Sequence, residues 1–358
     1  MRRGKWIILA ALPVVLILGD YVFWRMALHR LDSGFAAWRQ QAEAAGWTVR
    51  HDPPRPGGWP GTAALRIENF TVAAISPRGV PRGIVAGWTS GALVLRIHLT
   101  QPDVVEVTPI GPHTIRLAGG PPIAISGGPI ALRFPLRLSG PPRDFALEAE
   151  ALEAEALEAE ALEAAIPGSG TVHIASISAW AEVNDPERRD QPAASFSARV
   201  DGIVLPDAFR VGPDAPVDAV AIEGVVNGAL RDGGDMAARV RAWRDEGGSV
   251  ELHRLAVIWG QTRMEATATL ALDGDVQPMG TGTAKIAGYE PVLDRLAAKG
   301  VLSRAAVRAA KAMLTLLADT PAEGQPAEVE VPLTLQFRTL SVSQIPLARL
   351  PEVSWPSP

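Results

Sequence analysis

Most of this chain alternates between apolar and other residues with a period of two, and this pattern restricts the fold more than any other feature. Four segments show it clearly, at 91–99, 131–138, 264–272 and 329–337. Successive side chains of a strand point to opposite faces, so each segment predicts a strand with one apolar face. About a dozen such segments follow one another, separated by turns rich in glycine, proline and aspartate. Strands of this kind form antiparallel sheets rather than parallel ones.

The amino-terminal residues 1–24 predict a membrane anchor. Three basic residues within positions 1–5 precede an apolar run from Trp6 to Trp24. About 20 apolar residues are needed to cross the hydrocarbon core of a bilayer. Asp20 lies near the outer end of the run, where the cost of a carboxylate is smaller. We therefore expect a signal-anchor transmembrane helix whose basic end stays inside, with membrane contacts from Trp6, Leu12, Leu16, Tyr21 and Trp24.

A cleaved signal peptide is the alternative interpretation of the same run. Its apolar region would extend from Ile7 to Gly19. No small-x-small cleavage site follows Gly19, and a lipoprotein would need a cysteine, which the sequence lacks. The uncleaved anchor is the favoured prediction.

An amphipathic stalk helix is expected over residues 25–46. Leu28, Leu31, Phe35 and Trp38 recur at steps of three and four, which places them on one face of a helix. This stripe could contact a second copy or another protein, or it could pack on its own domain, which is the commoner arrangement. Residues 51–61 follow as a rigid elbow, because their prolines and glycines oppose regular structure.

A helical pair is expected late in the chain, at residues 289–319. Pro291 suits the first turn of a helix and Gly300 suits its end. Ser303 is a candidate cap for the second helix. Together these elements predict an α+β fold, with a transmembrane helix and stalk, a large curved antiparallel sheet, and the helical pair near the carboxyl terminus.

The segment 146–164 repeats the unit Ala-Leu-Glu-Ala-Glu and carries seven glutamates. Leucines five residues apart advance by about 140° around a helix, so they form no coiled-coil seam. An odd repeat also sends successive leucines to opposite faces of a strand. The repeat is therefore predicted to be a low-complexity acidic insertion that acts as a solvated spacer, with an acidic binding arm as the alternative.

Composition excludes several classes of function. The 358 residues carry a net charge of −5, and no basic patch with interleaved aromatic residues points to a nucleic-acid partner. Cysteine is absent and the six histidines are dispersed, so no metal site is predicted. No catalytic residue, metal ligand or cofactor-binding residue is assigned, and the chain is predicted not to be an enzyme.

Several motifs together resemble domain-of-unknown-function family 2125. They are Gly58-Trp59-Pro60 before a strand, the segment Ala268–Ser303, the sequence VPLTLQF, and the terminal IPLARLP. The resemblance implies a single-anchor envelope protein, chiefly of alphaproteobacteria, and the family pattern lacks the Ala-Glu repeat. It brings no catalytic or binding residues to this chain.

The expected function follows from the anchor and the sheet. We expect a noncatalytic, single-pass inner-membrane protein whose body, residues 47–358, lies in the periplasm and serves cell-envelope maintenance. An apolar sheet face that helices leave open would form a groove suited to acyl chains. The partners would be the lipid bilayer and a lipid ligand. The alternative is an envelope scaffold that contacts an envelope protein, and the oligomeric state is left open.

Overall fold

The computed structural model describes most of the chain. The described residues are 3–44, 46–75, 84–117, 122–136, 154–166, 170–183, 192–206, 216–229, 236–298, 304, 307–308, 311–312, 314, 328–342, 345–350, 352–353 and 355.

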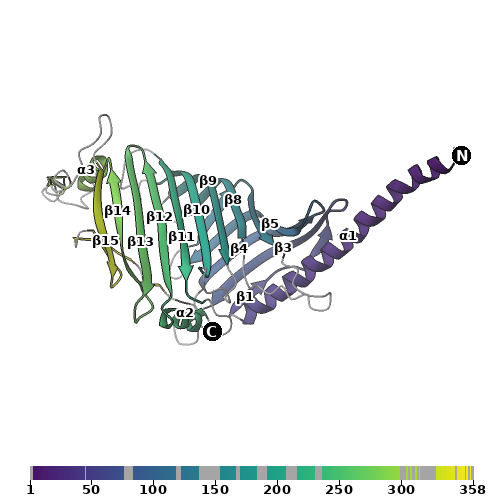
Figure 1. The fold of residues 1–358 in the computed structure, drawn as a ribbon, viewed down its shortest axis with the longest axis horizontal. Helices are drawn as coiled ribbons and strands as arrows, with labels where there is room; N and C mark the ends of the chain where they lie inside the picture. The colour runs from purple at the N-terminus through teal and green to yellow at the C-terminus, as the bar shows by residue number, and fades with distance from the viewer. Residues whose placement is uncertain are drawn as a thin grey trace.

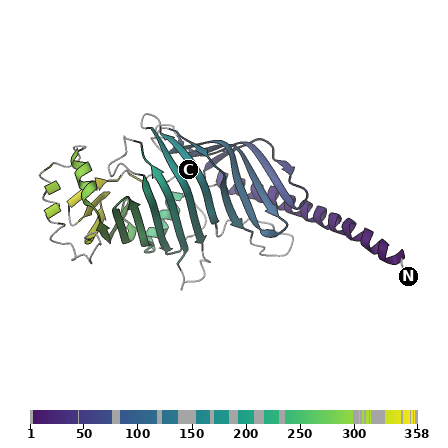
Figure 2. The same cartoon turned by 90° about the horizontal axis from the view of Figure 1, so that it is seen from above.

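The body is an antiparallel sheet in which each strand pairs with the next along the chain (Figure 1). Two exceptions modify this meander. Both β1 and β2 pair with β3, and both β6 and β7 lie between β5 and β8. The strands are β1 (Trp47–Arg50), β2 (Arg55–Gly57), β3 (Thr62–Ile75), β4 (Ile84–His98), β5 (Gln101–Leu117), β6 (Ile123–Gly127), β7 (Ile130–Pro135), β8 (Ala154–Ile166), β9 (Gly170–Val183), β10 (Ala194–Val204), β11 (Val217–Asn227), β12 (Ser249–Trp259), β13 (Thr262–Leu272), β14 (Pro278–Ala287), β15 (Glu328–Gln336), β16 (Thr339–Val342) and β17 (Ile345–Arg349). The predicted large antiparallel sheet is confirmed, and Figure 2 shows its curvature.

The anchor and the stalk were predicted as two helices, but they form one continuous helix, α1 (Arg3–Ala44). Its amino-terminal half projects beyond the sheet, whereas its carboxyl-terminal half packs on β1, β3 and β4 (Figures 1 and 2). Leu28, Leu31 and Phe35 are buried there against Leu65, Ile67 and other residues of the sheet. The predicted stripe therefore packs on its own domain, the arrangement favoured from the sequence, and is not a free interaction surface for a second copy or another protein.

Two shorter helices follow. Helix α3 (Glu290–Ala298) begins in the segment predicted to hold the helical pair, and the described residues between 304 and 314 are also helical. Helix α2 (Met236–Asp245) lies between β11 and β12 and has no counterpart in the sequence prediction. Its Trp243 donates a hydrogen bond of 2.8 Å from the indole nitrogen to the carbonyl of Asn227. This contact ties the helix to the end of β11.

The acidic repeat is not a solvated spacer in its described part. Strand β8 begins at Ala154 and takes most of its residues from the repeat, pairing with β6 and β7 on one side and β9 on the other. Residues 146–153 lie outside the described residues. The prediction failed because backbone pairing with two neighbours does not depend on the leucine spacing. An irregularity in the register between Ala154 and Leu157 also interrupts the simple alternation.

The elbow at residues 51–61 is also more regular than expected. Arg55–Gly57 form the short strand β2, which pairs with Ala64, Leu65 and Arg66 of β3. Pro56 can take part because β2 pairs on one side only in the described register.

Candidate functional site

One row of apolar residues crosses the sheet from β3 to β15. Each residue is the register partner of the next, so the row runs perpendicular to the strands. Its members are Leu65, Leu95, Val107, Leu132, Leu157, Ala179, Ala198, Ile222, Leu255, Ala266, Ala284 and Val331. Register partners lie directly opposite each other, so the described side chains of this row share one face. That face is apolar at every position of the row whose side chain the structure describes, on eleven strands.

Helices cover this face at its two ends. At one end, α1 packs on β3 and β4 around Ile67, Phe70 and Leu93. At the other end, Tyr289 and Leu293 from the start of α3 pack on Val329 and Val331. Both contacts are tightly buried clusters, in which apolar side chains are removed from water.

The middle of the face is different. The side chains in this region are all partly exposed, and in the described part of the chain neither buried cluster draws a residue from β9, β10 or β11. We call this surface the central apolar face and define it by Ile177, Ala179, Phe196, Ala198, Val200, Val220, Ile222 and Leu252. Partly exposed apolar side chains that adjoin in this way are typical of an interaction site.

The opposite face of the same strands is charged. Arg254 on β12 lies 3.8 Å from Glu223 and 3.0 Å from Glu265, on the strands to either side. Lys285 pairs in the same way with Glu330 at 3.8 Å. The ion-paired side chains are at least half exposed, so water reaches this face, although the apolar residues Val217, Ala219, Ala221 and Ala256 are buried among them. The central apolar face consists of apolar side chains alone and is the side that gains from a nonaqueous cover.

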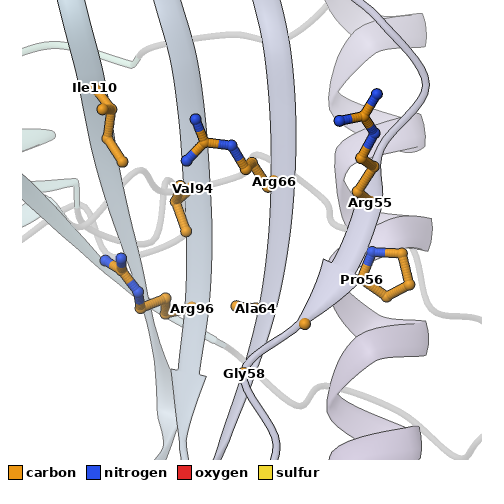
Figure 3. Close-up of a pocket in the computed structure, with 9 residues that line it drawn as sticks. Arg55, Pro56, Gly58, Ala64, Arg66, Val94, Arg96 and Ile110 are labelled. Carbon is orange, nitrogen blue, oxygen red and sulfur yellow. The ribbon is translucent and has the colours of Figure 1, made fainter.

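A pocket of about 380 Å³ opens on the charged face near α1 (Figure 3). Figure 3 shows Arg66 of β3 between Arg55 of β2 and Arg96 of β4. Glu68 lies 3.2 Å from both Arg55 and Arg66, and Glu106 lies 3.4 Å from Arg96. These carboxylates neutralise most of the charge, and exposed pairs of this kind contribute little stability. The pocket is therefore an open surface feature of the sheet, in which paired arginines lie over small apolar residues such as Ala64 and Val94.

His113 lies on the apolar side of β5, opposite Ser90 of β4. Its ring centroid is 6.3 Å from that of Trp88, and its Nδ1 atom is buried without a hydrogen-bond partner. Burial lowers the pKa of His113 below its usual value of 6.5, because the charged imidazolium would lose its hydration. Folding therefore favours the neutral form of this histidine.

This histidine predicts a pH dependence of stability. Unfolding restores the ordinary pKa, so at pH values just below 6.5 the unfolded chain binds more protons than the folded one. The contribution of neutral His113 to the free energy of unfolding is therefore complete above pH 6.5 and declines as the pH falls below 6.5. Urea unfolding of the full chain at a series of pH values measures this decline. The His113→Gln variant should show a flatter profile, and identical profiles for the two proteins would contradict the prediction.

The predicted anchor residues differ in their surroundings. Leu16 and Tyr21 are exposed on the projecting half of α1, and Trp24 donates a 2.9 Å hydrogen bond to the carbonyl of Gly57. The side chains of Trp6 and Leu12 lie outside the described residues. Within the described part of the chain, no helix combines the length and the apolar character needed to cross a membrane.

The central apolar face was not singled out from the sequence. Its strands show alternation, but each contributes only one to three residues, and half of these are alanine or valine. The signal that was present lies in the weaker alternating segments around Ile174, Phe196 and Ile222. Only the register between strands shows that these segments form one surface.

Comparison with known families shows the family of the chain. The model of a family described as an uncharacterized protein conserved in bacteria, DUF2125, matches residues 24–351. The chain belongs to this family. The match begins at Trp24, so the DUF2125 region includes the half of α1 that packs on the sheet and nearly all of the body. No curated protein sequence matches the chain.

Proposed function

We propose that this DUF2125 protein is a noncatalytic, inner-membrane-anchored periplasmic protein that binds lipid acyl chains on its central apolar face. The observation that carries the proposal is the apolar row, which continues across strands that no described helix covers. Acyl chains suit this face because they need apolar area and few directed polar contacts. The proposed anchor and lipid ligand support a proposed role in maintaining the bacterial cell envelope.

The projecting half of α1 supports the proposed anchor. Its large apolar side chains are exposed on all sides of the helix, at Val14, Val15, Leu16, Ile17, Leu18 and Val22. A helix that is apolar all round is stable when its whole circumference is buried, and a bilayer provides such surroundings. The basic residues at the amino terminus then favour a cytoplasmic start and a periplasmic body.

Site-specific photocrosslinking tests the lipid ligand. The full chain in its native membrane carries benzoylphenylalanine at Phe196, an aromatic residue of the central apolar face. The matched control carries it at Trp180, an exposed aromatic residue on the adjacent strand β9, whose register partner Ser197 follows Phe196. Trp180 therefore points to the charged face. Mass spectrometry should find lipid adducts at position 196 and not at 180.

Equal lipid adducts at both positions, or none at 196, would contradict acyl-chain binding. Adducts of another protein at 196 would favour the alternative, an envelope scaffold. The full chain is required, because a body that begins at residue 47 lacks Leu28, Leu31 and Phe35, which fill the core over β3 and β4.

A further inference from the structure

The contact between α1 and the body occurs at a defined place along the helix. The carboxylate of Asp20 accepts hydrogen bonds from the backbone nitrogen of Gly61, at 3.0 Å and 3.2 Å. Gly61 lies in the turn between β2 and β3. Its carbonyl in turn accepts a 2.9 Å hydrogen bond from the backbone nitrogen of Leu99, in the turn between β4 and β5. Asp20 thus fixes both turns to one level of the helix.

Three large apolar side chains are exposed at this level. Trp59 and Leu99, one from each turn, are 49% and 47% exposed, and Tyr21, next to Asp20, is 48% exposed. Hydrogen bonds among their neighbours hold the three residues at one end of the body. We call this group the turn rim. Exposed aromatic and aliphatic residues gathered in this way mark a contact surface.

The length of helix beyond the turn rim indicates what the contact is. Residues 3–19 rise about 26 Å along the helix, which is close to the roughly 30 Å of a bilayer core. If this part crosses the bilayer, Asp20 lies at the membrane surface. Tryptophan and tyrosine prefer that layer, where the ring is apolar and the polar atom remains hydrated. Arg25 is exposed one turn further along α1, where it can meet lipid phosphates.

We propose that the turn rim inserts into the headgroup layer of the membrane that holds α1, so that the body rests on the bilayer surface. This inference rests on the proposed anchor and adds a second contact with the same membrane. It also places β3 and β4, the first strands of the apolar face, beside the bilayer and β15 away from it.

Environment-sensitive labels test this placement. The sequence contains no cysteine, so single-cysteine variants of the full chain can be labelled directly. A nitrobenzoxadiazole fluorophore is attached at Trp59→Cys or Leu99→Cys, and the protein is reconstituted into vesicles of phosphatidylcholine and phosphatidylglycerol. Both labels should show blue-shifted emission and lose most of their fluorescence when the lipids carry a nitroxide near the headgroup. Trp59 and Leu99 are both exposed, so neither substitution disturbs the core.

Two further labels separate the turn rim from the anchor. Phe337→Cys is the control for water, because Phe337 is 84% exposed in the turn between β15 and β16. Val15→Cys reports the anchor itself. Quenching at 15, 59 and 99 but not at 337 supports the inference. Quenching at 15 alone overturns the turn rim and leaves the anchor, whereas no quenching at 15 overturns both. Labels at 59 and 99 that are blue-shifted without lipid quenching indicate a protein contact and also overturn it.

Discussion

Replacing Phe70 by alanine is expected to lower the free energy of unfolding by about 3–5 kcal/mol. Phe70 is 2% exposed and lies between α1 and the sheet. Its ring centroid is 6.0 Å from that of Trp38 on α1 and 5.6 Å from that of Trp88 on β4. The substitution removes both ring contacts and leaves a cavity that the helix and the sheet can fill only in part.

Urea unfolding of the full chain in detergent micelles, followed by tryptophan fluorescence, measures this loss. The matched control is Phe337→Ala, because Phe337 is largely exposed and its removal should change the free energy of unfolding by less than about 0.5 kcal/mol. A loss below about 1 kcal/mol for Phe70→Ala would mean that α1 contributes little to the stability of the body. The helix would then be a detachable anchor and not a part of the core.

Replacing Val200 by aspartate is expected to abolish the lipid adduct at position 196. Val200 and Phe196 lie on the same face of β10, opposite Val220 and Gly224 of β11. An ionised carboxylate placed under an acyl chain would have to give up its hydration without a partner, which costs several kcal/mol. Lipid should therefore leave the central apolar face, while the sheet should remain folded because Val200 is already partly exposed.

The control for this variant is Ser178→Asp. Ser178 is exposed on the charged face, where its register partner is Arg199. The same charge is introduced one strand away but on the other side of the sheet, so the lipid adduct at 196 should persist. Crosslinking yield and urea unfolding are measured for both variants. Persistence of the adduct in Val200→Asp, with the fold intact, would place the bound lipid elsewhere.

If lipid binds as proposed, the buried ends of the apolar face limit where the ligand can bind. The clusters around Phe70 and Val329 shield the two ends, and the central apolar face between them is the part available to a ligand. The turn rim would place one end beside the bilayer. Acyl chains would then meet a surface that is continuous with the strands nearest the membrane.

The sequence alone determined which residues share a face within a strand. Met264, Ala266 and Ala268 were predicted to lie together, and the register of β13 with β12 and β14 places them in neighbouring rows of the apolar side. The reason is local, because the pleat of a strand fixes alternation without reference to other strands. The helical character of 25–44 and of 290–298 was predictable for the same reason, from the spacing of three and four and from the Pro-Gly boundaries.

The neighbouring strands in the sheet determine where each alternating pattern ends. Leu99 and Phe337 continue the apolar period of their segments, yet both lie in turns and are exposed. Strand pairing ends before each of these residues, so their side chains have no neighbouring strand to pack against. The opposite holds for Leu28, Leu31 and Phe35. The sequence predicted that they share one face of a helix, but it did not predict which surface that face contacts. Only the position of β3 and β4 decided that the partner is the same chain.

The repeat and the central apolar face depended most on tertiary structure. As a free segment, the alanine-glutamate repeat favours a helix, but its like charges repel along that helix. Pairing β8 with strands on both sides supplies backbone hydrogen bonds that neither propensity nor side-chain spacing specifies. The central apolar face arises in the same way, from the register between the successive strands β9, β10, β11 and β12. Local chemistry therefore determined the strands and their faces, whereas long-range pairing decided which faces join and which part of them stays open.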